Sequence, residues 1–308
     1  GDLAGTPQPG QQWTMQDTGS GAGIGADRPK MNANALAAYN AATQAFISGD
    51  LVTAKKLYGD AIAADSKAFQ AHYSLGVVQE RLKEDTAALG SYKSAYTIVK
   101  DYEPAIVAWA TLKARKGGNS EADSFLSQKK NELPKSAAVL AALAEVKSLA
   151  KDSASAQNLA SEALKINPDY KPAMIVIARD YYRARKLDLA LYALKAILDG
   201  YDKENPPRDP ENAEALLLRG LIFKEQGDHA GAMDHFKRAV AKRPDLVEAR
   251  VHLATYLIKS GSGDQAKPLV ESALRFDSEN NAAHLLLGDV YRLEGEYVEG
   301  KKRFDHVL

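Results

Sequence analysis

The chain has 308 residues, of which 45% are hydrophobic and 26% are charged, and its 40 basic side chains are balanced by 40 acidic ones. Balanced charge argues against wholesale binding to nucleic acid or to an anionic membrane, because both need clustered positive charge. The sequence contains no cysteine, which excludes disulfides, cysteine-ligated metals and thiol nucleophiles. It also has no apolar run close to the roughly 18 residues that indicate a membrane-spanning helix.

Residues 1–34 are rich in Gly, Pro, Gln, Thr and Ser and show no apolar periodicity. Such a segment buries too little apolar surface to offset the entropy of ordering it, so we predict a flexible lead in which Trp13 could act as an anchor. The chain starts at Gly1 without an initiating Met. This start suggests an exported protein that has lost its signal, with a lipoprotein lacking its modified cysteine or a fragment of a cytosolic protein as alternatives.

From about residue 35, small residues recur every 34 residues in two interleaved series. The first series is Ala42, Gly76, Ala110, Ala144, Ala178, Gly220, Ala254 and Gly288, and the second is Ala54, Ala88, Ala122, Ala156, Ala190, Ala232, Ala266 and Gly300. Small residues let two helices approach to the short end of the roughly 8–10 Å range of helix packing. The pattern therefore predicts an all-α array of helix pairs over residues 35–308, with repeats that begin near Ala35, Phe69, Glu103, Ala137, Lys171, Ala213, Val247 and Asn281.

The spacing departs from 34 once, where residues 205–212 add eight residues that include Pro206, Pro207 and Pro210. These prolines predict a stiff loop at one edge of a continuous stack rather than a domain boundary. We interpret the loop as a tolerated insertion, with a docking loop as the alternative. The chain ends inside the second helix of the eighth repeat, where Phe304, Val307 and Leu308 would leave an apolar end. The expectation is that the natural chain continues or that this end rests on a neighbour.

The repeats carry further residues at fixed places, as in His72-x-x-Leu75-Gly76 and Ala54-x-x-x-Tyr58, and Pro134, Pro168 and Pro244 close three of them. Over about nine-tenths of its length the chain resembles the tetratricopeptide repeat family. The resemblance implies a right-handed superhelical solenoid of about eight helix-turn-helix repeats. It also implies a concave groove, lined by the first helix of each repeat, that binds peptides or protein segments.

In that family the fifth, ninth, twelfth and thirteenth places of a repeat line the groove. On this sequence they predict a partner-binding set of Tyr39, Phe46, Tyr73, Val77, Arg81, Arg115, Arg179, Tyr182 and Arg183, followed by an aliphatic stretch with Leu217, Leu221, Val251, Ile258 and Leu285. Arginine pairs with carboxylates and tyrosine offers rigid contact area, so the set suits a peptide with apolar anchors and acidic groups. The alternative is that these side chains are merely solvated or stack on one another.

Nothing in the sequence predicts catalysis, a cofactor or a metal site. The six histidines fall in different repeats without a His-Glu-x-x-His motif, and His72 and His284 take the place of the tryptophan that is usual in the family. No Gly-x-Ser-x-Gly nucleophile turn occurs in a strand-to-helix setting. The clamp by which chaperone-associated repeats hold a carboxylate needs Lys and Asn where this chain has Tyr39 and Thr43, so a heat-shock cochaperone role is disfavoured.

The glycine-rich lead, Met31-Asn32-Ala33-Asn34 and the alanine-heavy array also resemble bacterial outer-membrane lipoproteins with tetratricopeptide repeats that serve gliding motility or type IV pilus assembly. This resemblance implies a non-catalytic scaffold or adaptor at the periplasmic face of the outer membrane, whose partners are other proteins of an envelope complex. A cytoplasmic location is the alternative. The alternative function is a regulatory or ligand-binding part, for glycan or another non-protein ligand, of a larger protein or enzyme.

Overall fold

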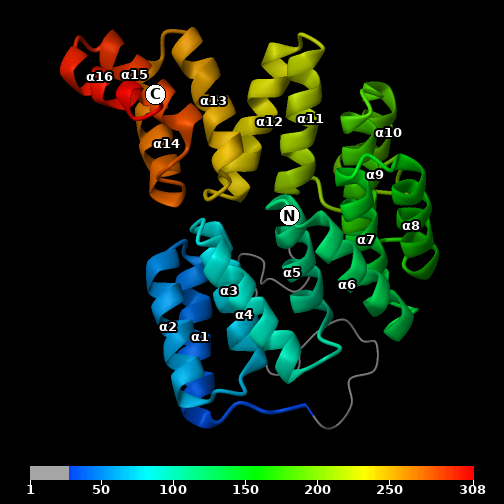
Figure 1. Cartoon of the computed structure of the whole chain (residues 1–308). Coiled ribbons are helices and arrows are strands. Elements are labelled where there is room, and N and C mark those ends of the chain that lie inside the picture. The colour runs from blue at the N-terminus through cyan, green and yellow to red at the C-terminus, as the bar shows by residue number, and fades with distance from the viewer. Residues whose placement is uncertain (1–27) are drawn as a thin grey trace. The chain divides into compact units, whose positions relative to one another are not determined.

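The computed structural model describes residues 28–308, and within this range the chain forms sixteen α-helices and no strand. The all-α class predicted from the sequence is confirmed. Figure 1 shows the helices following one another in hairpin-like pairs. Trp13, the predicted anchor of the lead, lies outside the described residues.

Each repeat supplies a first and a second helix. The first helices are α1 (Ala33–Ile47), α3 (Phe69–Arg81), α5 (Glu103–Arg115), α7 (Ala137–Leu149), α9 (Lys171–Arg183), α11 (Ala213–Glu225), α13 (Val247–Lys259) and α15 (Asn281–Leu293). The second helices are α2 (Leu51–Ala64), α4 (Asp85–Ile98), α6 (Asn119–Glu132), α8 (Ser153–Ile166), α10 (Leu187–Leu198), α12 (His229–Lys242), α14 (Gly263–Phe276) and α16 (Tyr297–Asp305). All first helices but α1 begin at the residue from which the 34-residue spacing counts a repeat. Helix α1 begins two residues earlier because the Asn32 side chain accepts a hydrogen bond from Ala35 N and caps it.

The described residues divide into two compact units, and the division falls inside α10, between Ala193 and Leu194. The first compact unit holds the first four repeats and α9, and the second holds the last three repeats and the loop before them. Each is described separately below. That residues 35–308 form one continuous solenoid stays a prediction.

In three repeats the core depends on a fit between a glycine of the first helix and an aromatic ring of the second. Gly76, Gly220 and Gly288 face the rings of Tyr92, Phe236 and Phe304, and a Cβ added at these glycines would lie 2.6–2.7 Å from a ring carbon. At the equivalent places three other repeats carry Ala110 and Leu126, Ala144 and Ala160, and Ala254 and Val270, all of them buried. At these two places glycine occurs with an aromatic residue and alanine with an aliphatic one, except that Ala42 occurs with Tyr58.

The turn between the two helices of a repeat always contains one residue with positive φ. Five repeats use glycine there, with φ between 80° and 93°, namely Gly49, Gly117, Gly227, Gly261 and Gly295. Lys83, Lys151 and Arg185 occupy the same place with φ of 63°, 65° and 62°. Because a Cβ disfavours left-handed backbone, these three turns are strained relative to the glycine turns.

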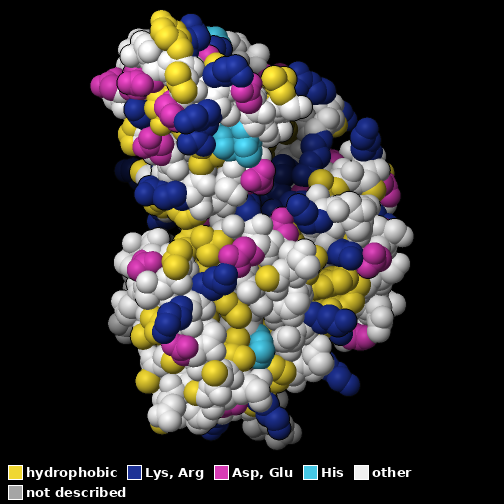
Figure 2. All heavy atoms as spheres, turned by 60° about the vertical axis from the view of Figure 1, so that its left-hand side comes forward, with side chains coloured by type: hydrophobic (Ala, Val, Ile, Leu, Met, Phe, Trp, Pro, Cys, Tyr) yellow, Lys and Arg dark blue, Asp and Glu magenta, His cyan; other side chains and the backbone are white. Residues whose placement is uncertain are grey.

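The added residues 205–212 form an irregular loop, as their prolines predict. Arg208 N donates to Ala196 O and Asp209 N donates to Ile197 O, so the loop folds back on the end of α10. At the end of the chain the Phe304 ring packs over Gly288 and is partly buried, whereas Leu308 is fully exposed. Figure 2 shows basic, acidic and apolar side chains interspersed over one face of the molecule.

Candidate functional site

In the first compact unit the first helices α5, α7 and α9 lie side by side. Helix α5 packs on α7 and α7 packs on α9, whereas the second helices α6 and α8 make no contact of comparable extent. A stack whose first helices approach each other more closely than its second helices curves with the first helices inside. We call the residues at the fifth, ninth, twelfth and thirteenth places of the first five repeats the inner face.

The structure corrects the prediction for the apolar members of the inner face. Tyr39, Phe46, Tyr73 and Val77 are only 2%, 7%, 0% and 1% exposed, so in this conformation they pack inside the repeats. The Tyr73 ring lies between the rings of Tyr92 and Tyr102, at centroid distances of 5.8 and 5.7 Å. Burial raises the pKa of Tyr73 well above its usual value. Sequence position placed these side chains on the correct helices, but large apolar side chains there fill the space between neighbouring helices.

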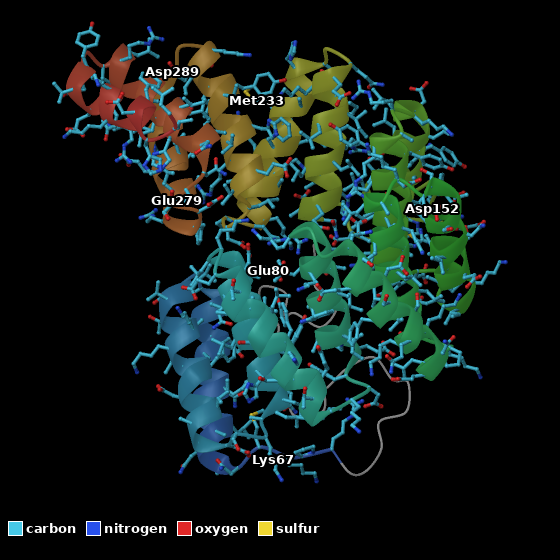
Figure 3. All side chains as sticks on the ribbon, in the orientation of Figure 1. Lys67, Glu80, Asp152, Met233, Glu279 and Asp289 are labelled. Carbon is cyan, nitrogen blue, oxygen red and sulfur yellow. The ribbon has the colours of Figure 1, made fainter. Side chains whose placement is uncertain are left out.

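The arginines of the inner face remain accessible. The guanidinium of Arg81 lies 4.6 Å from the centre of the Phe46 ring, so the predicted alternative of stacking applies to this residue. Arg115 pairs with Glu80, which also accepts a hydrogen bond of 2.7 Å from the Tyr92 hydroxyl. Figure 3 labels Glu80 near the end of α3.

The richest part of the inner face surrounds Glu145. This carboxylate is 5% exposed, and its Oε1 lies 2.9 Å from Nη1 of Arg179 and 2.8 Å from Nη2 of Arg183. Arg183 also donates from Nη1 to the Ser148 hydroxyl at 2.8 Å. Burial by itself would raise the pKa of Glu145, but the charges and hydrogen bonds of Arg179 and Arg183 outweigh it and lower the pKa below its usual value. Glu145 is therefore ionised at neutral pH and fixes both arginines.

One contact recurs between neighbouring repeats. The arginine at the thirteenth place meets the side chain at the twelfth place of the preceding repeat, as Arg81 meets Phe46, Arg115 meets Glu80 and Arg183 meets Ser148. Where the twelfth place is Ala114, the thirteenth place of the next repeat is Leu149. The arginines of the inner face are therefore held by the preceding repeat.

Sequence reasoning missed a buried carboxylate behind this face. Asp180 is 3% exposed and accepts hydrogen bonds from Ser148 at 2.8 Å, Ser153 at 3.1 Å and Gln157 at 2.8 Å. These bonds tie α7, α8 and α9 together. A charged residue on an otherwise apolar helix face, next to the serines of the preceding repeat, was the available signal.

The remaining predicted positions have mixed surroundings. Tyr182 is partly buried. In the second compact unit Leu217 is buried at 8% exposure, Leu221, Val251 and Ile258 are partly buried, and Leu285 is 42% exposed. This stretch is aliphatic, as predicted, but most of it contributes to packing.

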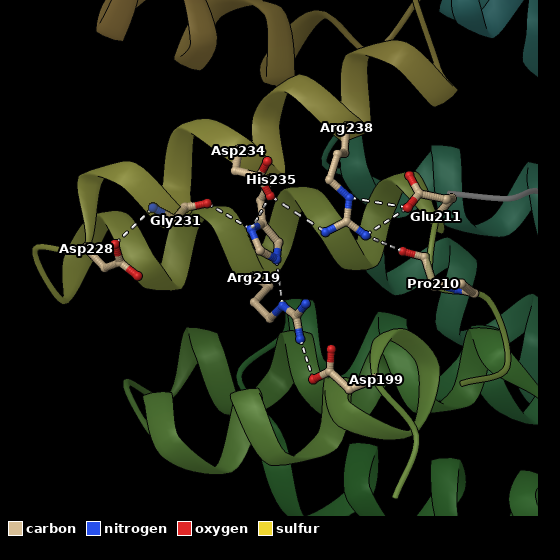
Figure 4. Close-up of polar contacts among 9 residues, drawn as sticks. All are labelled: Asp199, Pro210, Glu211, Arg219, Asp228, Gly231, Asp234, His235 and Arg238. Carbon is tan, nitrogen blue, oxygen red and sulfur yellow. Dashed lines mark hydrogen bonds and ion pairs between the residues drawn. The ribbon is translucent and has the colours of Figure 1, made fainter. Parts of the chain in front are cut away.

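The second compact unit contains a polar cluster that the sequence did not indicate (Figure 4). Arg219 donates from Nε to His235 Nε2 at 2.8 Å and from Nη1 to Asp199 at 2.6 Å, while His235 Nδ1 lies 2.8 Å from Gly231 O. The acceptor role of Nε2 means that the imidazole is neutral with its proton on Nδ1. Burial, together with the charges of Arg219 and Arg238, lowers the pKa of His235 against a smaller opposing effect of the Gly231 carbonyl.

Arg238 binds Glu211 and Pro210 O and so holds the end of the added loop to α12.

Within residues 28–308 no group of three or more His, Asp or Glu side chains is arranged to hold a metal ion. His72 and His284 each bond the carbonyl of the serine six residues earlier, at 3.0 and 2.7 Å. These bonds tie each ring to the turn that precedes its helix. No helix in the described part of the chain is long and apolar enough to cross a membrane.

Comparison with solved structures gives the same fold at low sequence identity. Yeast Tom70 superposes with a TM-score of 0.58 at 14% identity over 92% of this chain, and the chain spans 62% of the length of that structure. A tetratricopeptide repeat protein from Parabacteroides merdae ATCC 43184 gives a TM-score of 0.52 at 16% identity, with 84% of this chain and 99% of the other covered. The Cut9–Hcn1 hetero-tetramer of the APC/C gives 0.56 at 12% identity, with 88% and 52% covered. At these identities the likeness shows the fold alone.

Family assignment rests on the sequence. A sequence model of the tetratricopeptide repeat matches residues 39–103, 175–246 and 252–300, together more than half of the chain, and a second model of the same repeat matches residues 223–274. The matched segments fall on the helix pairs described above, including those that carry Glu80, Arg179 and Arg183. This chain belongs to the tetratricopeptide repeat family.

Proposed function

We propose that this protein is a non-catalytic interaction scaffold that binds a segment of a partner protein on its inner face. The observation that carries the proposal is the row of partly exposed arginines, each held in place by the preceding repeat. Fixed side chains lose little conformational freedom when they bind, so such a row is suited to recognition. The family supports protein binding as the general role.

The proposed setting is an envelope complex at the periplasmic face of a bacterial outer membrane, of the motility or pilus-assembly kind. It is supported by the resemblance of the glycine-rich lead and alanine-heavy array to envelope lipoproteins with this repeat. The setting predicts that the partners are other envelope proteins, and that an N-terminal lipid on the natural chain would serve as the anchor.

Site-specific photocrosslinking in the native cells tests the scaffold. A photoreactive phenylalanine analogue replaces Tyr182 on the inner face, and in a matched variant it replaces Lys93, which is exposed on the second helix α4. We expect a discrete crosslinked partner from position 182 and none from position 93. Crosslinks from position 93 alone would indicate that the partner binds the second helices instead. Mass spectrometry of the partner tests the setting, because cytosolic partners would contradict it.

Tyr73 is unsuitable for such a test although sequence reasoning placed it in the groove. Its side chain is fully buried, and truncating it would remove packing from two neighbouring rings. A large buried aromatic costs roughly 3–5 kcal/mol when it is replaced by alanine, so lost binding would report unfolding. Substitutions at Arg115 and Arg183 avoid this problem, because 46% and 31% of their side-chain surface is exposed.

A further inference from the structure

The inner face differs in charge from the chain as a whole. Its charged side chains are the four arginines Arg81, Arg115, Arg179 and Arg183, against only Glu80 and Glu145, whereas the whole chain is balanced at 40 basic and 40 acidic residues. In the nearby turns Glu84 pairs with Lys55 of α2, whereas Asp50 and Asp152 cap the second helices α2 and α8. The excess of positive charge therefore belongs to the inner face itself.

Exposure strengthens this bias. Glu80 and Glu145 retain only 13% and 6% of their side-chain surface, whereas Arg115, Arg179 and Arg183 retain 46%, 30% and 31%. The carboxylates thus lie beneath the guanidinium groups and orient them, and the groups that face solvent are mainly cationic. A partner that approaches this face meets guanidinium groups whose positions are already fixed.

These arginines are supported from two sides around Glu145. Arg183 bonds both Glu145 and Ser148, and Ser148 in turn donates to the buried Asp180. A guanidinium that is held in this way offers a planar donor edge, and it binds a carboxylate with less loss of rotamer entropy than a mobile lysine does. Arg81, stacked on Phe46, is likewise held in place.

The structure favours an acidic protein segment over nucleic acid. Proteins that bind single-stranded nucleic acid combine basic side chains with exposed aromatic rings on which the bases stack. On this face Tyr39, Phe46 and Tyr73 are buried, so the partly buried Tyr182 is the one inner-face ring left as a stacking surface. Carboxylates need only the guanidinium edges that the face presents.

We propose that the inner face formed by α3, α5 and α9 binds an extended segment of a partner protein that carries at least two acidic side chains. This proposal rests on the scaffold function proposed above and specifies the chemistry of the partner. One carboxylate binds near Arg115, and another binds near the pair Arg179 and Arg183. The carboxylates of Glu80 and Glu145 stay in place beneath them.

Fluorescence anisotropy of the whole chain with labelled decapeptides tests the proposal. The probe alternates Glu and Ser, and its neutral counterpart alternates Gln and Ser. We expect the acidic probe to bind at least about tenfold more tightly than the neutral one, and binding to weaken as salt rises from about 50 to 300 mM, because screened charges attract less. The double variant Arg115→Gln and Arg183→Gln should weaken the acidic probe by about tenfold or more.

The matched control removes two positive charges elsewhere. Lys93→Gln and Lys165→Gln lie on the second helices α4 and α8, are both exposed, and give the same net charge as the double arginine variant. We expect this control to change the affinity by less than about twofold. Circular dichroism of both double variants checks that helicity is retained.

Three results would overturn the proposal. Equal affinity for the acidic and neutral probes would show that carboxylates are not recognised. An equal loss of affinity in the lysine control would show that only the net charge of the protein matters. Tighter binding of a ten-nucleotide single-stranded RNA than of the acidic probe would indicate that the partner is a nucleic acid. If the acidic probe fails while the crosslink from position 182 persists, the scaffold function stands and only the acidic partner is lost. Failure of both experiments removes the scaffold function as well.

Discussion

The fit between Gly76 and Tyr92 gives the sharpest stability prediction. A Cβ added at Gly76 would lie 2.6 Å from both Cδ1 and Cε1 of the Tyr92 ring, about 1 Å closer than carbon atoms normally pack. The ring is fully buried, and its hydroxyl donates to Glu80 at 2.7 Å, so it has little room to move. Gly76→Ala should therefore destabilise the second repeat.

The size of the effect follows from two opposing contributions. Alanine is favoured over glycine inside a helix by about 1 kcal/mol. Overpacking of a well-packed core costs about 1–3 kcal/mol, and a contact this short belongs at the upper end of that range. The expected net loss in the free energy of unfolding is therefore about 1–2 kcal/mol. Gly90→Ala on α4 is the matched control, because nothing lies within 4 Å of a Cβ at that position. It should stabilise the protein by about 0.5–1 kcal/mol, from helix propensity alone.

Urea unfolding followed by circular dichroism measures both variants, and amide hydrogen exchange in α3 and α4 localises the change. The partner substitution Tyr92→Leu reproduces the pair found one repeat later, Ala110 with Leu126. We expect the double variant Gly76→Ala with Tyr92→Leu to be at least about 1 kcal/mol more stable than the sum of the single effects predicts. If Gly76→Ala is as stable as Gly90→Ala, or if the two sites are additive, the fit between glycine and ring does not control packing.

Three further predictions concern charge and backbone. Folding lowers the pKa of His235, so as the pH falls below about 6.5 the unfolded chain takes up the proton before the folded chain does. The free energy of unfolding should therefore decrease towards lower pH. His235→Gln should abolish this dependence in urea unfolding measured from about pH 7.5 to 5. Lys151→Gly should raise the free energy of unfolding by about 0.5–1 kcal/mol by relieving the left-handed turn, whereas Lys151→Ala should give no such gain. Glu145→Gln should destabilise the first compact unit by about 1–3 kcal/mol in urea unfolding, because two partly buried arginines lose their common carboxylate. An unchanged free energy of unfolding at pH 7 would mean that water solvates Arg179 and Arg183 as well as Glu145 does.

The fold could be predicted because it follows from a pattern of residues that repeats locally along the sequence. Every first helix except α1 begins where the 34-residue spacing begins a repeat, since small residues mark each helix crossing and glycine or a cap marks each end. The prolines of the added loop likewise act locally. The left-handed turn could have been found by the same alignment, because glycine fills that place in five repeats, but Lys83, Lys151 and Arg185 obscure it.

The candidate site was predictable only in part, because place within a repeat fixes a helix face but not the depth of a side chain. Tyr73 and Arg183 both belong to the inner face, yet Tyr73 is buried and Arg183 is 31% exposed. What decides the depth is the side chain that the neighbouring repeat supplies. Asp180 was missed for the same reason, since its partners Ser148 and Ser153 lie 32 and 27 residues away in sequence.

The inner face is thus a property of pairs of repeats, and this limits how its specificity can change. Arg115 and Arg183 reach solvent because the twelfth place before each of them is the polar Glu80 or Ser148, while Ala114 offers no acceptor and is followed by Leu149. A new arginine on this face would need a partner one repeat earlier to hold it, since an unsupported guanidinium would keep its rotamer freedom and lose it only on binding. The cationic groups are therefore confined to α3, α5 and α9, and α7 supplies the carboxylate that orients two of them.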